Sequence, residues 1–412
     1  MSTLKTNNIQ HVDRSDPSII INTDGSVNIA GTMTYEDVTS VDAVGIITGR
    51  EIINAQKQVH VGTGVSVKAG GINVTAGITT VQALQATSGT FSADSTFNSV
   101  SIGKGANSQA GNTVVGELAL DAVTTASGLT ALGYNALSSN TTGPKNVAIG
   151  NSALSSITTG DASTAVGFEA LKTTTASNNT AVGCNALRLS TTGGNNVAVG
   201  QNCMDANTTG SNNTAVGLNA LGGNTTADNN TAVGRDALEA NTTGTSNVAV
   251  GAQALALNTT ASQNTAVGYL SLTTNTTGQD NTAVGMDCMR LNTTGAQNTA
   301  LGQNTLEANT TADNNTALGY EALKANTVGN QHVAVGSGAL LKTTTASNNV
   351  AIGYMSAEET TTGFSNISIG SFALQENTTA YNNVAIGFQS MQDGNTNNGN
   401  VAVGYQAMKA NT

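Results

Sequence analysis

The polar and apolar residues of this chain follow a 17-residue repeat over its last three-quarters. Most repeats end in a string that reads Asn, Thr or Val, Ala, an aliphatic residue and Gly, as in residues 281–285. We call the last of these residues the closing Gly. Eighteen of them run from Gly116 to Gly404, and sixteen of the seventeen spacings are 17 residues; the step from Gly167 to Gly183 is 16. Such regularity is typical of a solenoid, whose repeats pack on their neighbours.

The string before the closing Gly alternates as a β-strand does. The residues one and three before the Gly are aliphatic or β-branched and share one face, while the Ala and the Asn share the other. An apolar pair, mostly Ala and Leu, follows three and four residues after the Gly and predicts a second short strand. A polar stretch such as residues 207–210 then predicts a turn. The sequence predicts an all-β chain, a parallel β-solenoid (β-roll) with one coil per repeat and Asn ladders at the turns.

The packing of one such coil predicts a further partner. About three buried apolar side chains contribute roughly 1.5–3 kcal/mol each. Ordering the backbone of 17 residues costs about 1–2 kcal/mol per residue. The nearly uniform Ala opposite the aliphatic face would let another backbone approach closely, so we expect an oligomer that packs on the Ala side.

Two coils illustrate the repeat positions that we expect to hold the roll together. These candidate structural residues are Asn213, Ala215, Val216, Gly217, Leu221, Asn281, Ala283, Val284, Gly285 and Met289. Charged residues such as Lys324 recur five residues after the closing Gly, and we expect that position to face water. Cys203 and Cys288 stand where most repeats have Ala, so we interpret them as small, half-buried replacements for Ala rather than as a disulfide framework; metal binding is the alternative.

Composition limits the function classes. Only 9% of residues are charged, against about 25% in a typical soluble domain, and the formal net charge is −11. The basic residues are scattered, so nucleic acid is not an expected partner. The first residues lack the apolar region of a secretory signal, and no apolar run is long enough to span a membrane. The sequence therefore predicts synthesis in the cytoplasm and no membrane span.

Residues that suggest chemistry have plainer explanations. His11 and His60 are isolated, and His332 replaces a ladder Asn; in a trimer, three copies of one His are an alternative metal site. The Asn-Thr-Thr triplets are interpreted as turns rather than glycosylation sites. Neighbouring Thr residues should point to opposite faces, which weakens an ice-binding array. Acidic residues vary between coils, so a two-carboxylate hydrolase is not favoured. We predict no enzyme activity, no metal and no cofactor.

The strings of the repeat also carry a resemblance. Residues 281–285 and their copies resemble the head repeat of trimeric autotransporter adhesins, over roughly residues 100–412. This resemblance implies a left-handed trimeric β-roll, hence a homotrimer. The membrane anchor and extended signal peptide of that family are not present in this sequence.

The first hundred residues break the period. Residues 31–48, with residues 2–11 and 19–22, resemble tail-fibre and virion structural proteins of marine cyanophages. That resemblance implies an N-terminal segment that attaches a fibre to a particle. We therefore divide the chain into a virion-attachment segment (1–58), a β-rich shaft with strands expected between residues 59 and 84 (59–103), and the repetitive roll (104–412).

These observations predict a structural fibre of a tailed phage virion, located in the virion and acting as rigid spacer and host-surface adhesin. Its expected partners are two further copies of the chain, other tail, baseplate or neck proteins at the N-terminus, and a virion protein or host receptor at the C-terminus. We favour a virion protein there because residues 392–399 are polar and lack the aromatic residues usual in sugar sites. The alternatives are a bacterial cell-surface trimeric adhesin and a free glycan- or ice-binding solenoid.

Overall fold

The computed structural model describes residues 8–10, 17–21, 23–24, 27–29, 95–97, 100–394 and 396–410. The chain forms two compact units, Met1–Ala86 and Thr87–Thr412. The described part of the first unit is an antiparallel sheet of β1 (Asn8–Gln10), β2 (Pro17–Ile21) and β3 (Val27–Ile29). The strands predicted between residues 59 and 84 lie outside the described residues, as do residues 31–48, His11 and His60.

The second unit begins with two antiparallel strands and continues as a parallel ladder. β4 (Ser95–Phe97) pairs with β5 (Val100–Gly103), and β5 pairs antiparallel with β6, the first strand of the roll. A short 3₁₀ turn, η1 (Ala106–Ser108), covers the first coil, where the Ala106 N–H donates to the Leu120 carbonyl at 3.1 Å. The parallel strands are β6 (Thr113–Gly116), β7 (Thr130–Leu132), β8 (Val147–Ile149), β9 (Thr164–Val166), β10 (Thr180–Val182), β11 (Val197–Val199), β12 (Thr214–Val216), β13 (Thr231–Val233), β14 (Val248–Val250), β15 (Thr265–Val267), β16 (Thr282–Val284), β17 (Thr299–Leu301), β18 (Thr316–Leu318), β19 (Val333–Val335), β20 (Val350–Ile352), β21 (Ile367–Ile369), β22 (Val384–Ile386) and β23 (Val401–Val403).

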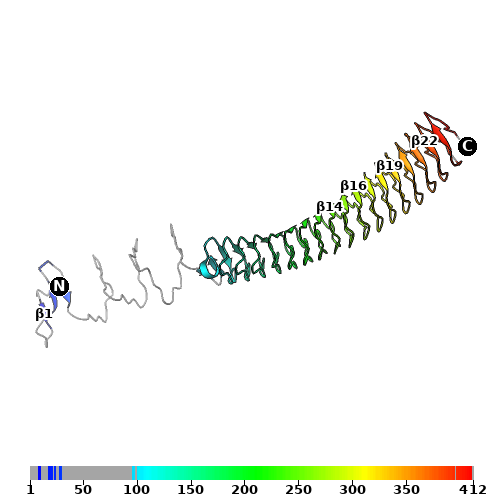
Figure 1. Ribbon diagram of the computed structural model, residues 1–412. Coiled ribbons are helices and arrows are strands. Elements are labelled where there is room, and N and C mark those ends of the chain that lie inside the picture. Colours follow the sequence, from blue (N-terminus) through cyan, green and yellow to red (C-terminus); the bar gives the residue numbers. More distant parts are fainter. Residues whose placement is uncertain are drawn as a thin grey trace. The chain divides into compact units, whose positions relative to one another are not determined.

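The eighteen strands stack in register, one per coil, with seventeen turns of the roll between the first and the last. Each repeat position lies beside its own copy; in β16 and β17, for example, Ala283 pairs with Ala300. Figure 1 shows the strand arrows following one another along one side of the roll. The predicted all-β parallel solenoid of roughly 17-residue coils is confirmed.

The closing Gly is required by the way the coils approach each other. Gly285 has φ of +141°, and a Cβ built on it would lie 2.3 Å from the carbonyl oxygen of Gly302, the closing Gly of the next coil. A side chain there would collide with backbone and would also be strained at this φ. The same contact explains why the Gly recurs at the end of each strand.

The predicted second strand is wrong. The apolar pair after the closing Gly lies in a turn in which the second and fourth residues are left-handed, as at Asp287 (φ 53°) and Met289 (φ 51°). These residues still bond to neighbouring coils, because the Met289 N–H donates to the Thr305 carbonyl at 3.0 Å. Asn and Asp tolerate the left-handed region, which accounts for the seven coils that have one of them at the second position. Leu and Met do not favour it, so the fourth position has no local sequence signal.

The core of each coil lies between the strand and this turn. The Ala of the strand points inward and is fully buried, as at Ala283, where it faces the apolar pair of the turn; Met289 is also fully buried. The residues on either side, Thr282 and Val284, point outward. The expectation that the Ala side receives a partner chain is therefore wrong, because that side is filled by the coil's own Leu or Met. Because the Leu or Met of the turn fills the interior, the inward strand position is held by a small residue, Ala or Ser, in every coil except the first, which has Val114.

The coil with one residue fewer keeps the ladder. Its strand β10 pairs in register with β9 and β11. The shortening falls in the turn after Leu171, where the Thr173 hydroxyl donates to the carbonyls of Arg188 and Ser190 at 3.0 and 2.8 Å. The turn absorbs the missing residue, and the strands on both sides stay in register.

Candidate functional site

The ten candidate structural residues fall into two groups. The buried group lines the interior of the coils, with Asn213, Ala215, Leu221, Asn281, Ala283 and Met289 all at 0% exposure. Val216 and Val284 point outward instead, and Gly217 and Gly285 end their strands. The roll thus has an inner polar and apolar framework and a separate outer surface, and only the outer surface is available to a partner.

The first inner ladder is formed by the Asn four residues before the closing Gly. The Asn281 Oδ1 accepts the backbone N–H of Asn298, one coil further on, at 3.0 Å. The Asn281 Nδ2 donates to the Gly295 carbonyl at 2.8 Å. The same two bonds recur in neighbouring coils, so each buried amide satisfies backbone groups of the adjoining turn. This confirms the predicted Asn ladder.

His332 takes a place in this ladder. Its backbone N–H donates to Asn315 Oδ1 at 2.9 Å, its Nδ1 accepts the N–H of Asn349 at 3.2 Å, and its Nε2 lies 2.8 Å from the Ala346 carbonyl. These partners assign a neutral ring with the proton on Nε2. Burial lowers the pKa of the His332 imidazole. Because both ring nitrogens are occupied and the residue is fully buried, the ring is not placed to bind a metal.

A second ladder runs along the Asn seven residues after the closing Gly. Each Nδ2 donates to Oδ1 of the Asn one coil earlier, from Asn224–Asn207 at 2.8 Å to Asn326–Asn309 at 3.2 Å. These Asn residues begin the Asn-Thr-Thr triplets and are fully buried, which supports the turn interpretation. Asn140 occupies the same position without a ladder, since Val123 and Ile157 hold it in the adjoining coils; its side-chain amide has no hydrogen bond.

The cysteines follow their repeat position. Cys203 and Cys288 are fully buried in the Ala site of the turn, and burial raises the pKa of each thiol to about 12. The Cys203 Sγ lies 3.3 Å from the Ala215 carbonyl, within reach of a weak hydrogen bond. Cys184 is exposed, and all three thiols are free. Such buried thiols are inert core residues.

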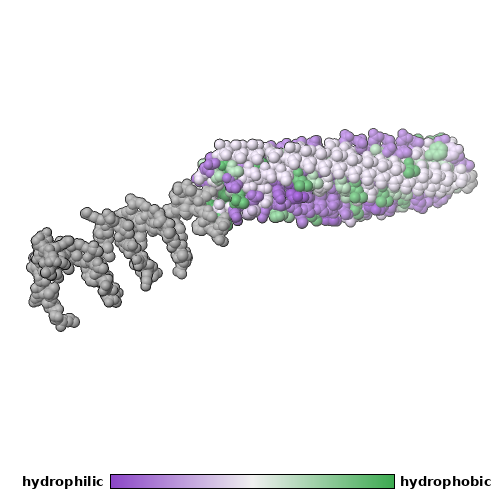
Figure 2. Space-filling view, turned by 90° about the horizontal axis from the view of Figure 1, so that it is seen from below, coloured by the Kyte–Doolittle hydropathy of each residue, from purple (hydrophilic) through white to green (hydrophobic). Residues whose placement is uncertain are grey.

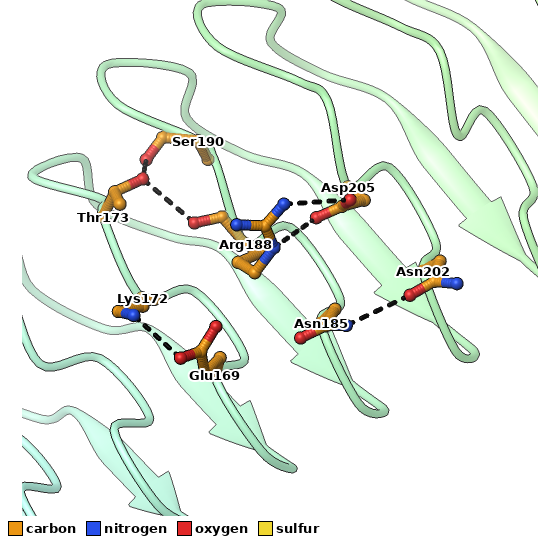
Figure 3. A network of polar contacts seen from close by, with 8 residues as sticks. All are labelled: Glu169, Lys172, Thr173, Asn185, Arg188, Ser190, Asn202 and Asp205. Carbon is orange, nitrogen blue, oxygen red and sulfur yellow. Dashed lines mark hydrogen bonds and ion pairs between the residues drawn. The ribbon is translucent and has the colours of Figure 1, made fainter.

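The charged row five residues after the closing Gly faces the surface, as predicted. Arg188 pairs with Asp205 of the next coil at 2.9 Å, and Arg290 pairs with Glu307 at 2.7 Å. Figure 3 shows the Arg188–Asp205 pair beside the Asn185–Asn202 bond of 3.3 Å between the same two coils. These contacts join consecutive coils from outside, where each exposed ion pair contributes little, typically 0–1 kcal/mol.

The outward strand face consists of the residues one and three before each closing Gly. All eighteen residues one before the Gly are Val, Ile or Leu; of those three before, ten are Thr and eight are Val or Ile. Val216 and Val250 are each 37% exposed, and Leu301 is 45% exposed. The face is free of charge along the whole ladder. A continuous uncharged apolar strip of this length is unusual on a monomer and is typical of an interaction surface.

Two rows of Thr form a different surface at the polar turn. The Thr eight residues after the closing Gly bonds along the roll, as Thr208 Oγ1 donates to the Thr225 carbonyl at 2.9 Å. The residue nine after it, Thr209 or its equivalent, is exposed. Both residues therefore reach the surface, and the expectation that they point to opposite faces is wrong, because they lie in a bend rather than a strand. The face drawn in Figure 2 carries long rows of near-neutral residues beside hydrophilic ones, with hydrophobic residues scattered among them.

The last four coils carry a row of aromatic residues, which we call the aromatic strip: Tyr354, Phe372, Phe388 and Tyr405. Consecutive ring centroids lie 5.3, 6.0 and 5.7 Å apart. Residues 392–399 lack aromatic residues, but the coils around them contain several. The absence of aromatic residues from that one segment therefore does not argue against a sugar site in the last coils. The sequence could have predicted this row, because each of the four aromatic residues follows a closing Gly by one or two positions in consecutive repeats.

Other candidate chemistry is not assembled. Glu358 accepts a bond from Gln375 at 2.9 Å, while Glu359 pairs with Lys342 at 2.7 Å, so these two carboxylates serve different neighbours. Within the described residues, no group of three or more His, Cys, Asp or Glu side chains is placed to hold a metal ion. No helix in the described part of the chain combines the length and apolar character that a membrane crossing requires.

Comparison with known proteins adds no relative. No protein-family model matches the chain, and no curated protein sequence matches it.

Proposed function

We propose that this chain is a structural fibre protein of a tailed phage virion, assembled as a homotrimer and serving as rigid spacer and host-surface adhesin. The observation that carries the proposal is the outward strand face: an uninterrupted row of aliphatic side chains, one coil after another, on a roll whose interior is filled by its own residues. Because this face is uncharged and apolar, it suits burial against copies of itself. The resemblance of the repeat to trimeric adhesin heads favours three copies and a left-handed roll.

In such a fibre, the inner residues would stabilise each chain and the outer face would hold the chains together. The Asn ladders and the Ala–Leu core hold each coil, while burial of the outward face would join the chains. A Val that is about one-third exposed gains on the order of 0.5–1 kcal/mol when fully covered. Because the face repeats over eighteen coils, this small gain in free energy adds up along the roll. The association of chains would therefore turn a narrow roll with a small core into a stiff rod. The resemblance of the first residues to cyanophage virion proteins supports attachment at that end.

The assembly is tested by native mass spectrometry and sedimentation of the full chain. The expected mass is three times the chain mass of 41.1 kDa. The variant Val216→Glu/Val250→Glu places charges on the outward face and should yield monomers. The matched control Thr209→Glu/Thr243→Glu places the same charges in the same coils on the exposed Thr rows and should stay trimeric. A wild-type monomer, or a trimer that tolerates the Val variant, would overturn the proposed interface.

The virion location is tested separately. Mass spectrometry of purified particles from a phage that encodes this chain should detect it in a stoichiometry that is a multiple of three per particle. Its presence only in the membrane fraction of a bacterium would favour the cell-surface adhesin instead.

A second candidate, the free ice-binding solenoid, gains support from the Thr rows. Their methyl and hydroxyl groups repeat at the coil spacing of about 4.8 Å on an uncharged surface. Inhibition of ice recrystallisation by the wild type, lost in Thr209→Glu/Thr243→Glu, would favour it. Equal ice growth with the wild type and with the Thr variant would exclude the ice-binding function.

A further inference from the structure

The aromatic residues of the roll are concentrated at one end. Ten Phe and Tyr residues follow residue 103, and six of them lie in the last four coils between residues 354 and 405. Four of these form the aromatic strip, in which Tyr354 is 46%, Phe388 42% and Tyr405 72% exposed. Exposed aromatic rings that are already packed against one another lose little conformational freedom when a ligand binds.

In the last four coils, the two positions after the closing Gly hold no charged residue. The Gln406 Nε2 donates to Gln389 Oε1 at 2.7 Å, which holds two amides beside Phe388 and Tyr405. The Gln406 Oε1 and the Gln389 Nε2 have no hydrogen-bond partner in the described part of the chain. In some earlier coils the same position, two residues after the closing Gly, holds an acidic residue such as Asp236 or Glu321. The strip thus combines ring surface with amide and phenol groups, and its own residues carry no formal charge.

We propose that the aromatic strip is a binding site for neutral saccharides. The C–H faces and edges of a sugar ring pack on aromatic rings, while its hydroxyl groups both donate to and accept from amides and the Tyr hydroxyl. Sites that combine apolar aromatic surface with a few polar groups are typical of small-ligand recognition. Rings repeated in four successive coils suit an extended oligosaccharide of several units.

Charge argues against an anionic ligand. The row five and six residues after the closing Gly carries Glu358, Glu359 and Glu376 in these coils. Within the described part of the chain, Glu359 pairs with Lys342, and Glu358 and Glu376 have no ion pair. The formal net charge of −11 adds to the repulsion of polyanions such as nucleic acid or acidic polysaccharide.

A purely structural explanation of the strip makes a different prediction. The second Asn ladder stops at Asn326, and Thr343 and Thr360 hold its position in the next two coils. Ring stacking contributes about 0.5–1.5 kcal/mol per pair, so the strip would also stabilise coils that lack the ladder. If that were its only role, removing the rings would lower stability without changing any binding.

The experiment uses the full-length chain and isolates binding from stability. Cellohexaose, maltohexaose and mannohexaose are titrated while ligand binding is followed by saturation-transfer NMR. We expect at least one of these sugars to bind to the wild type. The variant Tyr354→Leu/Tyr405→Leu should bind the same sugar at least tenfold more weakly. The melting temperature of the variant is measured in parallel. The matched control Tyr269→Leu/Tyr320→Leu changes isolated Tyr residues at the same repeat position, each 50% exposed, and should bind as the wild type does.

The outcomes separate cleanly. No binding of any of the three sugars, equal binding by the strip variant, or equal loss in the control variant would overturn the proposal. Should the double variant unfold, Gln406→Ala keeps all four rings and should still weaken binding severalfold. The inference deepens the proposed adhesive role and rests on it. The trimer and virion tests contain no sugar, so failure of one proposal is distinguishable from failure of the other.

Discussion

The inward and outward sides of the same strands differ in every respect that matters for assembly. Inward, Ala and Asn are buried and bonded within the chain; outward, Thr and Val repeat without charge and without cover. Both sides are equally regular, so regularity alone does not identify the core. The difference shows that the strand of this narrow solenoid turns its small residues inward, where the Leu or Met of the turn completes the core, and leaves its larger aliphatic residues on the surface.

Charge introduced on the two sides of one strand should give the largest contrast. Ala283→Glu puts a carboxylate into the closed interior and should destabilise by roughly 4–5 kcal/mol or more, because an unpaired buried charge is costly. Val284→Glu, its neighbour, should leave the isolated coil almost unchanged and weaken only association. Circular dichroism melts at concentrations above and below the dissociation of the oligomer separate the two. Equal losses at all concentrations would mean that both residues are interior.

The Asn positions test the inner side more finely. Asn258→Ala removes a donor to Asn241 Oδ1 at 2.9 Å and an acceptor for Asn275 Nδ2 at 3.1 Å. Leaving such buried groups unpaired should cost about 1–3 kcal/mol. Asn140→Val removes an amide that has no partner and should stabilise the protein by a similar amount. The two variants should change the free energy of unfolding in opposite directions at the same repeat position, and chemical denaturation measures both changes. A loss of stability in Asn140→Val would show that the Asn140 amide is hydrogen-bonded, for instance to water.

The sequence predicted the period, the strand and the Asn ladders because each depends on local alternation or on a residue that repeats at a turn. Alternation shows which residues share a face, as Ala283 and Asn281 do, but it does not show which face is inside. That depends on the left-handed turn that brings Met289 back over the strand, and Met carries no signal for this conformation. The aromatic strip was overlooked because its four rings are about one coil apart in sequence and come side by side only through the stacking of coils.

His332 interrupts the ladder with a group that titrates. Burial lowers the pKa of its imidazole, so between the folded and unfolded pKa the unfolded chain binds more protons. Stability is therefore complete above about pH 6.5, the ordinary value for His, and falls as the pH drops below it, by at most about 1.4 kcal/mol per pH unit. His332→Asn restores the ladder and should remove this loss. Melting curves of both proteins at pH 7 and pH 5 test this: a gap that is no wider at pH 5 would contradict it.

The smallest effect is expected on the charged row. Lys324 lies 2.6 Å from Glu321 and 4.0 Å from Glu307, and the side chains of this row are roughly one-fifth to one-third exposed. Lys324→Gln should cost no more than about 0.5 kcal/mol, because solvent screens such pairs. The hydrogen bond from Lys324 lowers the pKa of the Glu321 carboxyl, so the stabilisation is present above the ordinary pKa of Glu and is lost as the pH falls through the lowered value. In the variant, NMR titration should show the Glu321 pKa rising towards its ordinary value, and the stabilities of the two proteins should converge in acid. A cost of several kcal/mol would place this row in the core and reverse the distinction between the inner and outer surfaces on which the assembly proposal depends.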